Sequence, residues 1–501
     1  MAPVRAKLIG GLLLVALLSG AASPGPASAR AVSPRAGAPR RSELAPVRMA
    51  SPRGASPARP PRARGPLARA STTHGPTVSA ALSALLAKGA IERTVYSEDL
   101  ATYVAAKHAI ANLSGTRRSE LEAVLANTQA LAASGKLIPS RLAITFLTLE
   151  RNREWWTTEP LLGASQRVSF PDSEIVWEHY AGQGVQIQWL GTFGEGNGYF
   201  SAHENTHLRQ LLSEVIPLAT DRAGGIAWEY MFTFDGGAPP WTSALSQGTA
   251  IQLLARAYSR YHEAIYLQAA QEALGIFESP PPQGVRVDAA GAPALYAQYS
   301  FAPTDRILNG FIQSLVGLYD YTSITKDPVG LALFEAGDAE ARILVPRYDT
   351  GAWSLYDQYG ESSLNYHELL TEFLQHLCER TQKGPPLGPQ VPLTADGIYC
   401  TTAQRFTADL TTPPVVSLLS TTLRTSTRAG VAVSLSKISY VKLTVSRGSQ
   451  VVWTVAATVG GGHPRLLWKT PNTPGSYSVA VSATDLAGNH AAATGTITLK
   501  R

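Results

Sequence analysis

The stretch Ile307–Asp320, with the sequence ILNGFIQSLVGLYD, decides how the middle of this chain folds. Its apolar residues recur at helical spacing over a broad face, which predicts a largely buried helix. The polar pair Asn309-Gly310 nevertheless stands in its first turn.

Helical periodicity extends in both directions from this stretch. Apolar stripes at helical spacing occur at Leu208–Leu218, Ile251–Tyr258, Ile265–Leu274 and Leu364–Leu377, and a helical pattern also covers residues 77–163. Residues 176–180 and 185–190 instead predict short strands or extended loops. We therefore expect residues 76–411 to form a mostly α body with a few short strands.

The pattern changes after Thr412-Pro413-Pro414. Seven short β-rich runs follow, separated by Gly, Pro and Asn turns: 415–419, 430–435, 441–445, 451–456, 465–468, 477–482 and 496–499. They predict that residues 412–501 form an all-β immunoglobulin-like sandwich, and Pro474–Asn489 resembles the last hairpin of bacterial modules of that kind. We expect a spacer, with carbohydrate or cell-wall binding as the alternative. We also expect the chain up to Thr411 to fold and act without it.

The first residues have the features of an export signal. Arg5 and Lys7 precede an apolar run over residues 8–18, and Ala27-Ser28-Ala29 offers small residues for cleavage. Residues 1–29 thus predict a signal peptide and a secreted or cell-surface protein. No later segment has the length and hydropathy of a membrane span.

Residues 30–75 are rich in Pro, Ala, Ser and Arg, with ten arginines and one glutamate between Arg30 and Arg69. A segment with so few large apolar residues predicts a disordered linker. Attachment to an anionic wall polymer is the functional alternative. The whole chain has a net charge of +6, so the remainder is mildly acidic. No aromatic residues interleave with the arginines, which argues against nucleic-acid binding.

Two further patterns admit two interpretations each. Cys378 and Cys400 are the two cysteines, and in an exported protein they predict a disulfide, with two buried thiols as the alternative. His203-Glu204-Asn205-Thr206-His207 matches the zinc motif HEXXH, for which Glu229 has a suitable separation as third ligand. Its histidines continue the stripe that contains Leu211, so we predict packing and capping roles and no metal.

The remaining motifs are defined by their order and spacing along the middle of the chain. They are Pro240-Trp241, Gln247-Gly248, the thirteen-residue block from Tyr299 to Phe311, the turn Tyr348–Gly351 followed by Tyr356-Asp357, and Tyr366-His367. In this order, over about residues 225–377, they resemble the C-terminal catalytic domain of the D-glucuronyl C5-epimerase family. The resemblance implies an α/α toroid that acts on uronate units of an acidic polysaccharide without a cofactor.

The resemblance also implies a set of site residues. The catalytic ones would be Tyr299, Tyr356 and Tyr366, and the substrate-binding ones Trp241, Gln247, Glu229, Gln298, Arg306, Asn309 and His367. Inverting C5 requires removal of a proton on one face of the sugar and its return on the other. Phenols would serve if nearby cations or hydrogen bonds lowered their pKa.

Two positions depart from the family's animal members. Gln298 occupies the place of a catalytic glutamate, and Tyr359 that of an arginine. Glu229 or Tyr296 would then replace the base, and Arg306 or Arg347 would neutralise the substrate carboxylate. The alternatives to an epimerase are a uronate polysaccharide lyase, which shares the proton removal, and a polysaccharide-binding protein without catalysis.

Overall fold

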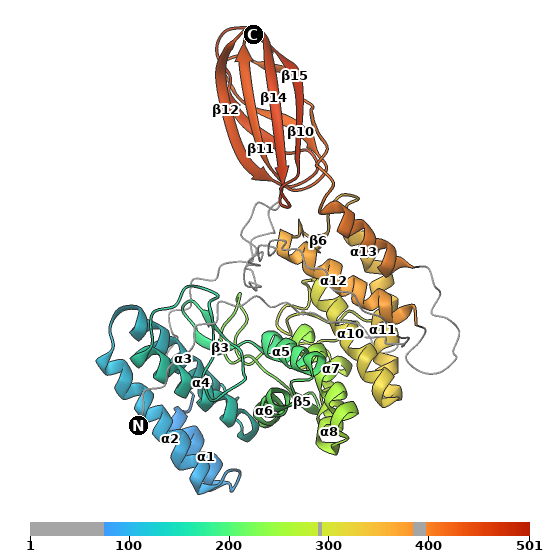
Figure 1. Ribbon diagram of the computed structural model, residues 1–501. Helices are drawn as coiled ribbons and strands as arrows, with labels where there is room; N and C mark the ends of the chain where they lie inside the picture. Colours follow the sequence, from blue (N-terminus) through green and yellow to red (C-terminus); the bar gives the residue numbers. More distant parts are fainter. Residues whose placement is uncertain (1–74, 289–292, 384–396) are drawn as a thin grey trace, which may run out of the picture.

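The computed structural model describes residues 75–288, 293–383 and 397–501. The predicted signal peptide and nearly all of the predicted linker lie outside these residues. Figure 1 shows a helical body and a strand-rich C-terminal part that meets the body near α13. Among the described residues, no helix is long and apolar enough to cross a membrane.

The first quarter of the body is helical, as predicted. Its four helices are α1 (Val78–Ala87), α2 (Arg93–Asn112), α3 (Gly115–Ala133) and α4 (Pro139–Thr158). Thr77 begins α1 by accepting a hydrogen bond from the backbone N–H of Ala80 at 3.2 Å, as an N-cap residue does. Pro139 stands in the first turn of α4, where its missing N–H costs nothing.

A small antiparallel sheet follows, in the order β1-β2-β3. Its strands are β1 (Arg167–Val168), β2 (Trp177–Tyr180) and β3 (Gly184–Ile187), and two further hairpins come from β4 (Thr220–Arg222) with β5 (Gly225–Ala227) and β6 (Leu355–Asp357) with β7 (Gly360–Glu361). Every residue of β2 and β3 is buried. The two strands predicted from 176–190 are therefore present, although residues from Trp189 onward begin a helix.

Helices form the rest of the body. They are α5 (Trp189–Ala202), α6 (Asn205–Val215), α7 (Ala244–Tyr261), α8 (Ala264–Glu272), α9 (Gly275–Glu278), α10 (Leu308–Thr325), α11 (Pro328–Leu344), α12 (Leu364–Thr381) and α13 (Ile398–Asp409), with short 3₁₀ turns at Ile216–Leu218 and Val345–Tyr348. A disulfide between Cys378 and Cys400 joins α12 to α13. Their closure into an α/α toroid stays a prediction.

The helix over Ile307–Asp320 is α10, and it packs closely on α7. A Cβ at Gly317 would lie 2.0 Å from the carbonyl oxygen of Gly248, and one at Gly248 would lie 2.6 Å from Cα of Ser314. Only glycine permits backbones to approach this closely. Gly248 therefore sets the distance between the two helices.

The stripe predicted at Ile265 is partly wrong, because Ile265 is exposed and α8 buries Tyr266, Ala269 and Ala270.

The C-terminal β unit, residues 416–500, contains eight described strands. These are β8 (Val416–Leu418), β9 (Thr422–Arg424), β10 (Arg428–Leu435), β11 (Ser439–Arg447), β12 (Gln450–Val459), β13 (Arg465–Lys469), β14 (Gly475–Asp485) and β15 (His490–Lys500). Seven match the predicted runs. The sequence interpretation missed β9, which pairs in parallel with the end of β15.

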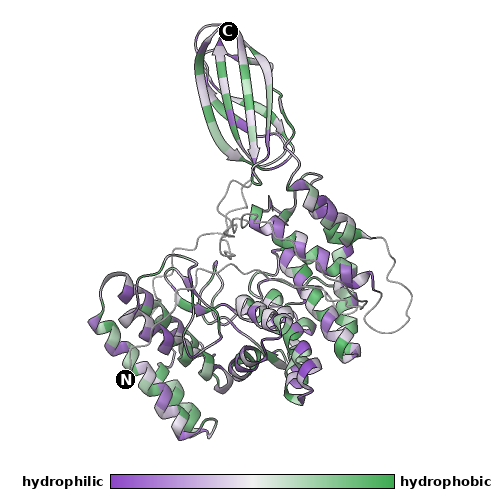
Figure 2. Cartoon of the chain, in the orientation of Figure 1, coloured by the Kyte–Doolittle hydropathy of each residue, from purple (hydrophilic) through white to green (hydrophobic). Residues whose placement is uncertain are grey.

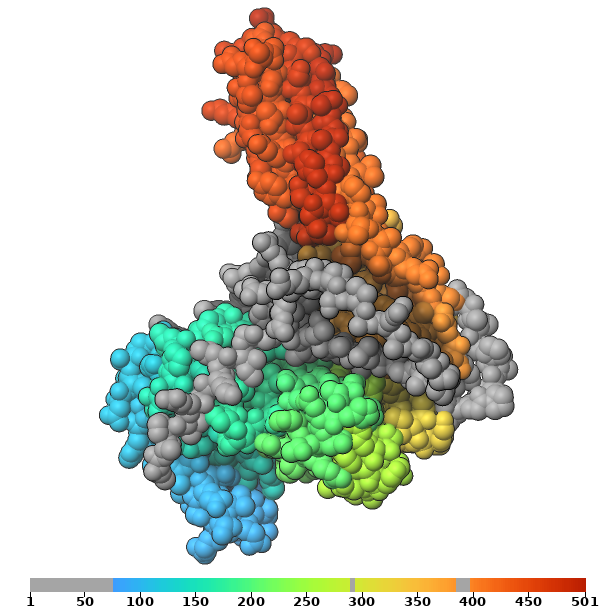
Figure 3. All heavy atoms as spheres, viewed as in Figure 1, coloured from blue at the N-terminus to red at the C-terminus, as the bar shows by residue number. Residues whose placement is uncertain are grey.

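The strands of the C-terminal β unit form two sheets, ordered β13-β10-β8 and β12-β11-β14-β15-β9. Colours alternate along several strands in Figure 2, because inward apolar residues alternate with outward polar ones. The inward residues form a core of their own, to which β11 contributes Val441, Leu443 and Val445. Membership of the immunoglobulin-like class stays a prediction. Figure 3 shows this unit standing away from the body and meeting it at one end.

Candidate active site

The structure brings the three predicted catalytic tyrosines together. Tyr356 lies on β6 and Tyr366 in the first turn of α12, and their ring centroids are 4.7 Å apart. Tyr299 lies in the loop before α10 and is close enough to influence the pKa of Tyr356. Tyr366 in turn influences the pKa of Tyr299. We call these three residues the tyrosine cluster.

Backbone hydrogen bonds fix the loop that carries Tyr299. The N–H of Ala297 donates to the carbonyl of Val285 at 2.8 Å, and the N–H of Ser300 donates to that of Thr242 at 3.0 Å. The Tyr299 ring stacks on Phe301 with centroids 5.4 Å apart. Regular secondary structure is thus unnecessary for holding this tyrosine in place.

Two buried amides beside the cluster have polar atoms without hydrogen-bond partners among the described residues. Gln298 donates from Nε2 to the hydroxyl oxygen of Tyr299 at 2.9 Å, but its Oε1 has no partner. Neither amide atom of Asn309 has one, although the residue is only 3% exposed. Buried polar atoms without partners are costly in a folded protein. Asn309 and Gln298 are therefore suited to hydrogen-bond a ligand.

Burial acts on the pKa of the tyrosines in the direction opposite to the expected one. It raises the pKa of both Tyr299 and Tyr356, and neighbouring tyrosines raise them further. Hydrogen bonding by Gln298 opposes this increase only in part. Removing a phenolate from water is unfavourable, so these phenols are held in the neutral form.

Two predicted binding residues are instead engaged inside the protein. Gln247 donates from Nε2 to the carbonyl of Trp228 at 2.9 Å, which ties α7 to the strand region before it. Trp241 is 1% exposed, stacks on Tyr230 with centroids 4.1 Å apart, and meets Tyr299 edge-on at 5.8 Å. Both side chains are used internally, and a sugar cannot stack on a tryptophan that is covered.

His367 also has internal partners on both ring nitrogens. Its Nε2 lies 2.9 Å from the carbonyl oxygen of Phe406, and its Nδ1 accepts from the N–H of Ser354 at 3.2 Å. A carbonyl oxygen only accepts, so the partners fix the proton on Nε2. Burial lowers the pKa of His367 to about 4. It is a neutral residue that positions its surroundings.

The groups expected to replace the missing base and arginine are mostly engaged elsewhere. Glu229 is fully buried and accepts from Arg141 Nε at 2.6 Å and from Arg222, so its lone pairs are occupied. The hydroxyl of Tyr296 donates to the carbonyl of Leu333 at 2.7 Å. Arg306 pairs with Glu340 at 3.2 Å. Arg347, by contrast, is exposed to solvent.

The zinc motif is divided by a helix end. His203 ends α5 in the left-handed conformation with φ 60°, and α6 begins at Asn205. The two histidines therefore do not share a helix face. The predicted capping role is confirmed for His203, which is the C-cap residue of α5. The predicted packing is only partly right for His207, whose ring contacts Tyr199 while its side chain is 53% exposed and pairs with Glu174 at 2.7 Å. The described residues contain no group of three His, Cys, Asp or Glu side chains arranged to hold a metal ion.

Sequence interpretation missed a carboxyl group that borders the aromatic surroundings of the cluster. Glu178 is fully buried, and neither of its oxygens has a hydrogen-bond partner among the described residues. Burial raises its pKa from 4.5 to about 7, against the effect of Arg167, whose Nε lies 3.6 Å away. The signal was visible as a charged residue inside the aromatic run Trp177–Tyr180.

Glu178 is connected to the cluster through Tyr180, which is two residues along β2 and so lies on the same face of the strand. The Tyr180 ring meets Phe234 at 6.2 Å, and Phe234 meets Tyr299 at 5.7 Å. Tyr299 also raises the pKa of Tyr180. Two aromatic rings, those of Tyr180 and Phe234, therefore lie between this carboxyl group and Tyr299.

Comparison with known proteins identifies a related family for the middle of the chain. Residues 222–385, about a third of the chain, match the family described as "D-glucuronyl C5-epimerase C-terminus". The D-glucuronyl C5-epimerase of Caenorhabditis elegans is 34% identical over 132 residues, which are 24% of this chain and 21% of that protein. The tyrosine cluster, Gln298 and Asn309 all lie within the matched segment, whereas Glu178 lies before it.

Two further similarities are partial. An uncharacterised protein of Methanocaldococcus jannaschii is 28% identical over 151 residues, covering 29% of this chain and 49% of its own. The chain thus matches less than half of the length of either relative. A solved engineered protein shares 16% identity, covering 39% of this chain and 46% of its own, and its TM-score of 0.16 is too low to indicate a common fold.

Proposed function

We propose that this protein is a carbohydrate epimerase that inverts C5 of D-glucuronate units in a polysaccharide. The observation that carries the proposal is the meeting of Tyr299, Tyr356 and Tyr366, from three separate elements, within the segment that matches the epimerase family. The unpartnered amides of Asn309 and Gln298 supply hydrogen-bonding groups for a sugar at the same place.

The neutral state of the phenols suits the second proton transfer of the reaction, the return of a proton to C5. Inversion at C5 needs a group that takes the proton from one face and another that returns a proton to the opposite face. Because burial raises the pKa of Tyr299 and Tyr356, a phenol of the cluster acts as the proton donor. Reprotonation from it completes the inversion.

The other half needs a proton acceptor near neutral pH, which Gln298 cannot be. Glu178 is our candidate, because a general base is most effective when its pKa is near the working pH, and its pKa is about 7. Arg167 beside it would neutralise the uronate carboxylate, on which charge develops as the proton leaves. Bringing Glu178 to C5 requires the rings of Tyr180 and Phe234, which lie between β2 and Tyr299, to move aside for the sugar.

The setting of the reaction is also part of the proposal. The charged start, short apolar run and small residues of the first 29 positions support export. A basic linker and the C-terminal β unit would then keep the enzyme near an acidic wall polymer.

One experiment separates this function from its alternatives. The protein is incubated in heavy water with several glucuronate polysaccharides, and the products are analysed by NMR and mass spectrometry. An epimerase incorporates deuterium at C5, forms iduronate and leaves chain length unchanged. A lyase yields shorter chains with an unsaturated end that absorbs in the ultraviolet. Binding with neither deuterium at C5 nor shortened, unsaturated chains on any polymer would contradict both enzymatic functions.

A further inference from the structure

The hairpin β6–β7, which presents Tyr356, is held from outside the helical body. Its last residue, Glu361, directs its carboxylate into the C-terminal β unit. Oε1 accepts from the N–H of Ile438 at 3.0 Å, and Oε2 accepts from the N–H of Gly461 at 2.7 Å. A Cβ at Gly461 would lie 3.2 Å from Oε1. The loop therefore approaches the carboxylate closely because it carries glycine there.

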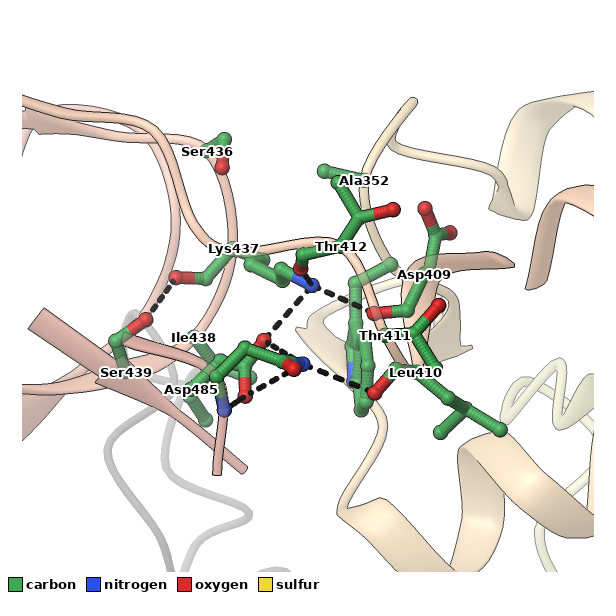
Figure 4. A network of polar contacts seen from close by, with 12 residues as sticks. Ala352, Asp409, Leu410, Thr411, Thr412, Ser436, Lys437, Ile438, Ser439 and Asp485 are labelled. Atoms are coloured by element: carbon green, nitrogen blue, oxygen red, sulfur yellow. Dashed lines mark hydrogen bonds and ion pairs between the residues drawn. The ribbon is translucent and has the colours of Figure 1, made fainter. Parts of the chain in front are cut away.

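A buried lysine makes the second connection. The Lys437 side chain is 1% exposed, and its Nζ lies 2.8 Å from Oδ2 of Asp485, which is equally buried. The same ammonium donates to the carbonyls of Asp409 at 2.7 Å and Thr412 at 2.5 Å. Figure 4 shows these contacts where the last helix passes into the β unit. A buried charge with all its partners satisfied fixes one geometry, because any displacement leaves it unpaired.

Lys437 also reaches the residues behind the tyrosine cluster. Its Nζ lies 5.3 Å from the ring centroid of Trp353, a favourable position for a cation over an aromatic face. Trp353 is fully buried and stacks on His367 with centroids 3.7 Å apart and an angle of 7°. Its Nε1 donates to the carbonyl of Ser362 at 2.9 Å. A continuous stack thus runs from Lys437 to the residue next to Tyr366.

We propose that the C-terminal β unit is a working part of the active site, in which Lys437 and the Ile438 and Gly461 amides position Tyr356 and Tyr366. The β unit positions the two tyrosines and does not contact the substrate. The catalytic part of this inference, an effect on turnover, rests on the proposed function. Its mechanical part, the positioning of the two tyrosines, rests on the contacts alone. The two parts have separate apolar cores, so the connection between them is polar and specific.

The test compares Lys437→Met with Lys442→Met in the full-length protein. Lys442 is exposed on β11 of the same unit, so the control makes the same chemical change without touching the junction. Glu361→Gln is a second junction variant, which is used if Lys437→Met does not fold. Circular dichroism and thermal unfolding establish that each variant is folded.

The first readout is hydrogen exchange by mass spectrometry over residues 353–367, which requires no substrate. We expect at least about a 10-fold loss of protection in the junction variants, with α7 and α10 unchanged and Lys442→Met like the wild type. Unchanged protection of residues 353–367 in both junction variants would overturn the inference.

The second readout is turnover measured as deuterium entry at C5. Because a small misplacement of a reacting group lowers rate more than binding, we expect kcat to fall by about 10-fold or more, with KM within about 2-fold. Normal kcat together with lost protection would overturn the catalytic part. A wild type that exchanges no C5 hydrogen contradicts the proposed function, and the hydrogen-exchange result then decides the mechanical part alone.

Discussion

At the scale of residues, the candidate site holds neutral tyrosines, and a buried carboxyl group from another element lies beyond two aromatic rings. The glutamine at position 298 removes a base next to Tyr299 but keeps a hydrogen bond to its hydroxyl. Burial then keeps the phenols protonated, and the same effect brings the pKa of Glu178 to about 7. Burial thus favours the neutral form of both the phenols and the Glu178 carboxyl group.

Replacing Tyr356 or Tyr366 with Phe should lower turnover by about 100-fold or more, the usual cost of losing an acid or base group. The reason is that Phe keeps the ring contact of 4.7 Å and removes only the hydroxyl that carries the proton. Deuterium entry at C5 is the measurement. Tyr440→Phe is the matched control, because Tyr440 is 52% exposed in the C-terminal β unit. Equal turnover in all three variants would remove both tyrosines from the mechanism.

Glu178 should make stability depend on pH. A carboxyl group whose folded-state pKa is raised from 4.5 to about 7 binds its proton more tightly when folded. The free energy of unfolding therefore falls as pH rises from 4.5 to 7, by up to about 3 kcal/mol, and falls no further above 7. Glu178→Gln should remove this part of the slope.

Denaturant unfolding of the wild type and Glu178→Gln between about pH 4.5 and 8.5 measures the difference. The same variant should lose most C5 exchange if Glu178 accepts the proton. Parallel stability profiles would show that the carboxyl ionises as it does in water, and retained exchange would assign the base elsewhere.

At the scale of elements, the position of a helix end decides whether the residues of a motif lie on one helix face. The HEXXH motif needs one helix, but the left-handed His203 ends α5 inside it, so the two histidines belong to different helices. The contact between α7 and α10 shows the opposite case. There Gly248 and Gly317 face each other at backbone distance, and the helix that carries Asn309 in its first turn is held firmly.

Gly317→Ala should destabilise the protein by about 2 to 3 kcal/mol, because its methyl group would meet the carbonyl of Gly248 at 2.0 Å and the helices must separate. Gly198→Ala in α5 is the control, since a Cβ there meets nothing within 4 Å, and helix propensity predicts a gain of up to about 1 kcal/mol. Urea unfolding measures both. A neutral Gly317→Ala would mean that the two helices can move apart freely.

At the scale of the whole molecule, the junction changes the expectation for a shortened chain. The sequence predicts that residues up to Thr411 act alone, whereas Glu361 and Trp353 have partners in the C-terminal β unit. A chain ending at Thr411 should keep its helical signal, since its apolar core is separate. Its turnover should fall by about 10-fold or more because the hairpin of Tyr356 loses its support.

Circular dichroism and C5 exchange on short oligosaccharides test this expectation, with the full-length chain as reference. Full activity of the shortened chain would return the C-terminal β unit to the role of a spacer. Loss of the helical signal would show that the two parts depend on each other for folding.

The sequence by itself determined the local structure and the tyrosines. Helical and strand periodicity depends on near neighbours, so the helices other than α5 and seven of the eight described C-terminal strands could be predicted. The family resemblance proposed Tyr299, Tyr356 and Tyr366 as site residues. Tertiary structure alone decided that Glu229 is held by two arginines, that Glu178 is fully buried, and that Lys437 lies over the ring of Trp353. These depend on burial and on contacts between distant segments, which shift pKa values and satisfy side chains without leaving a periodic pattern in the chain.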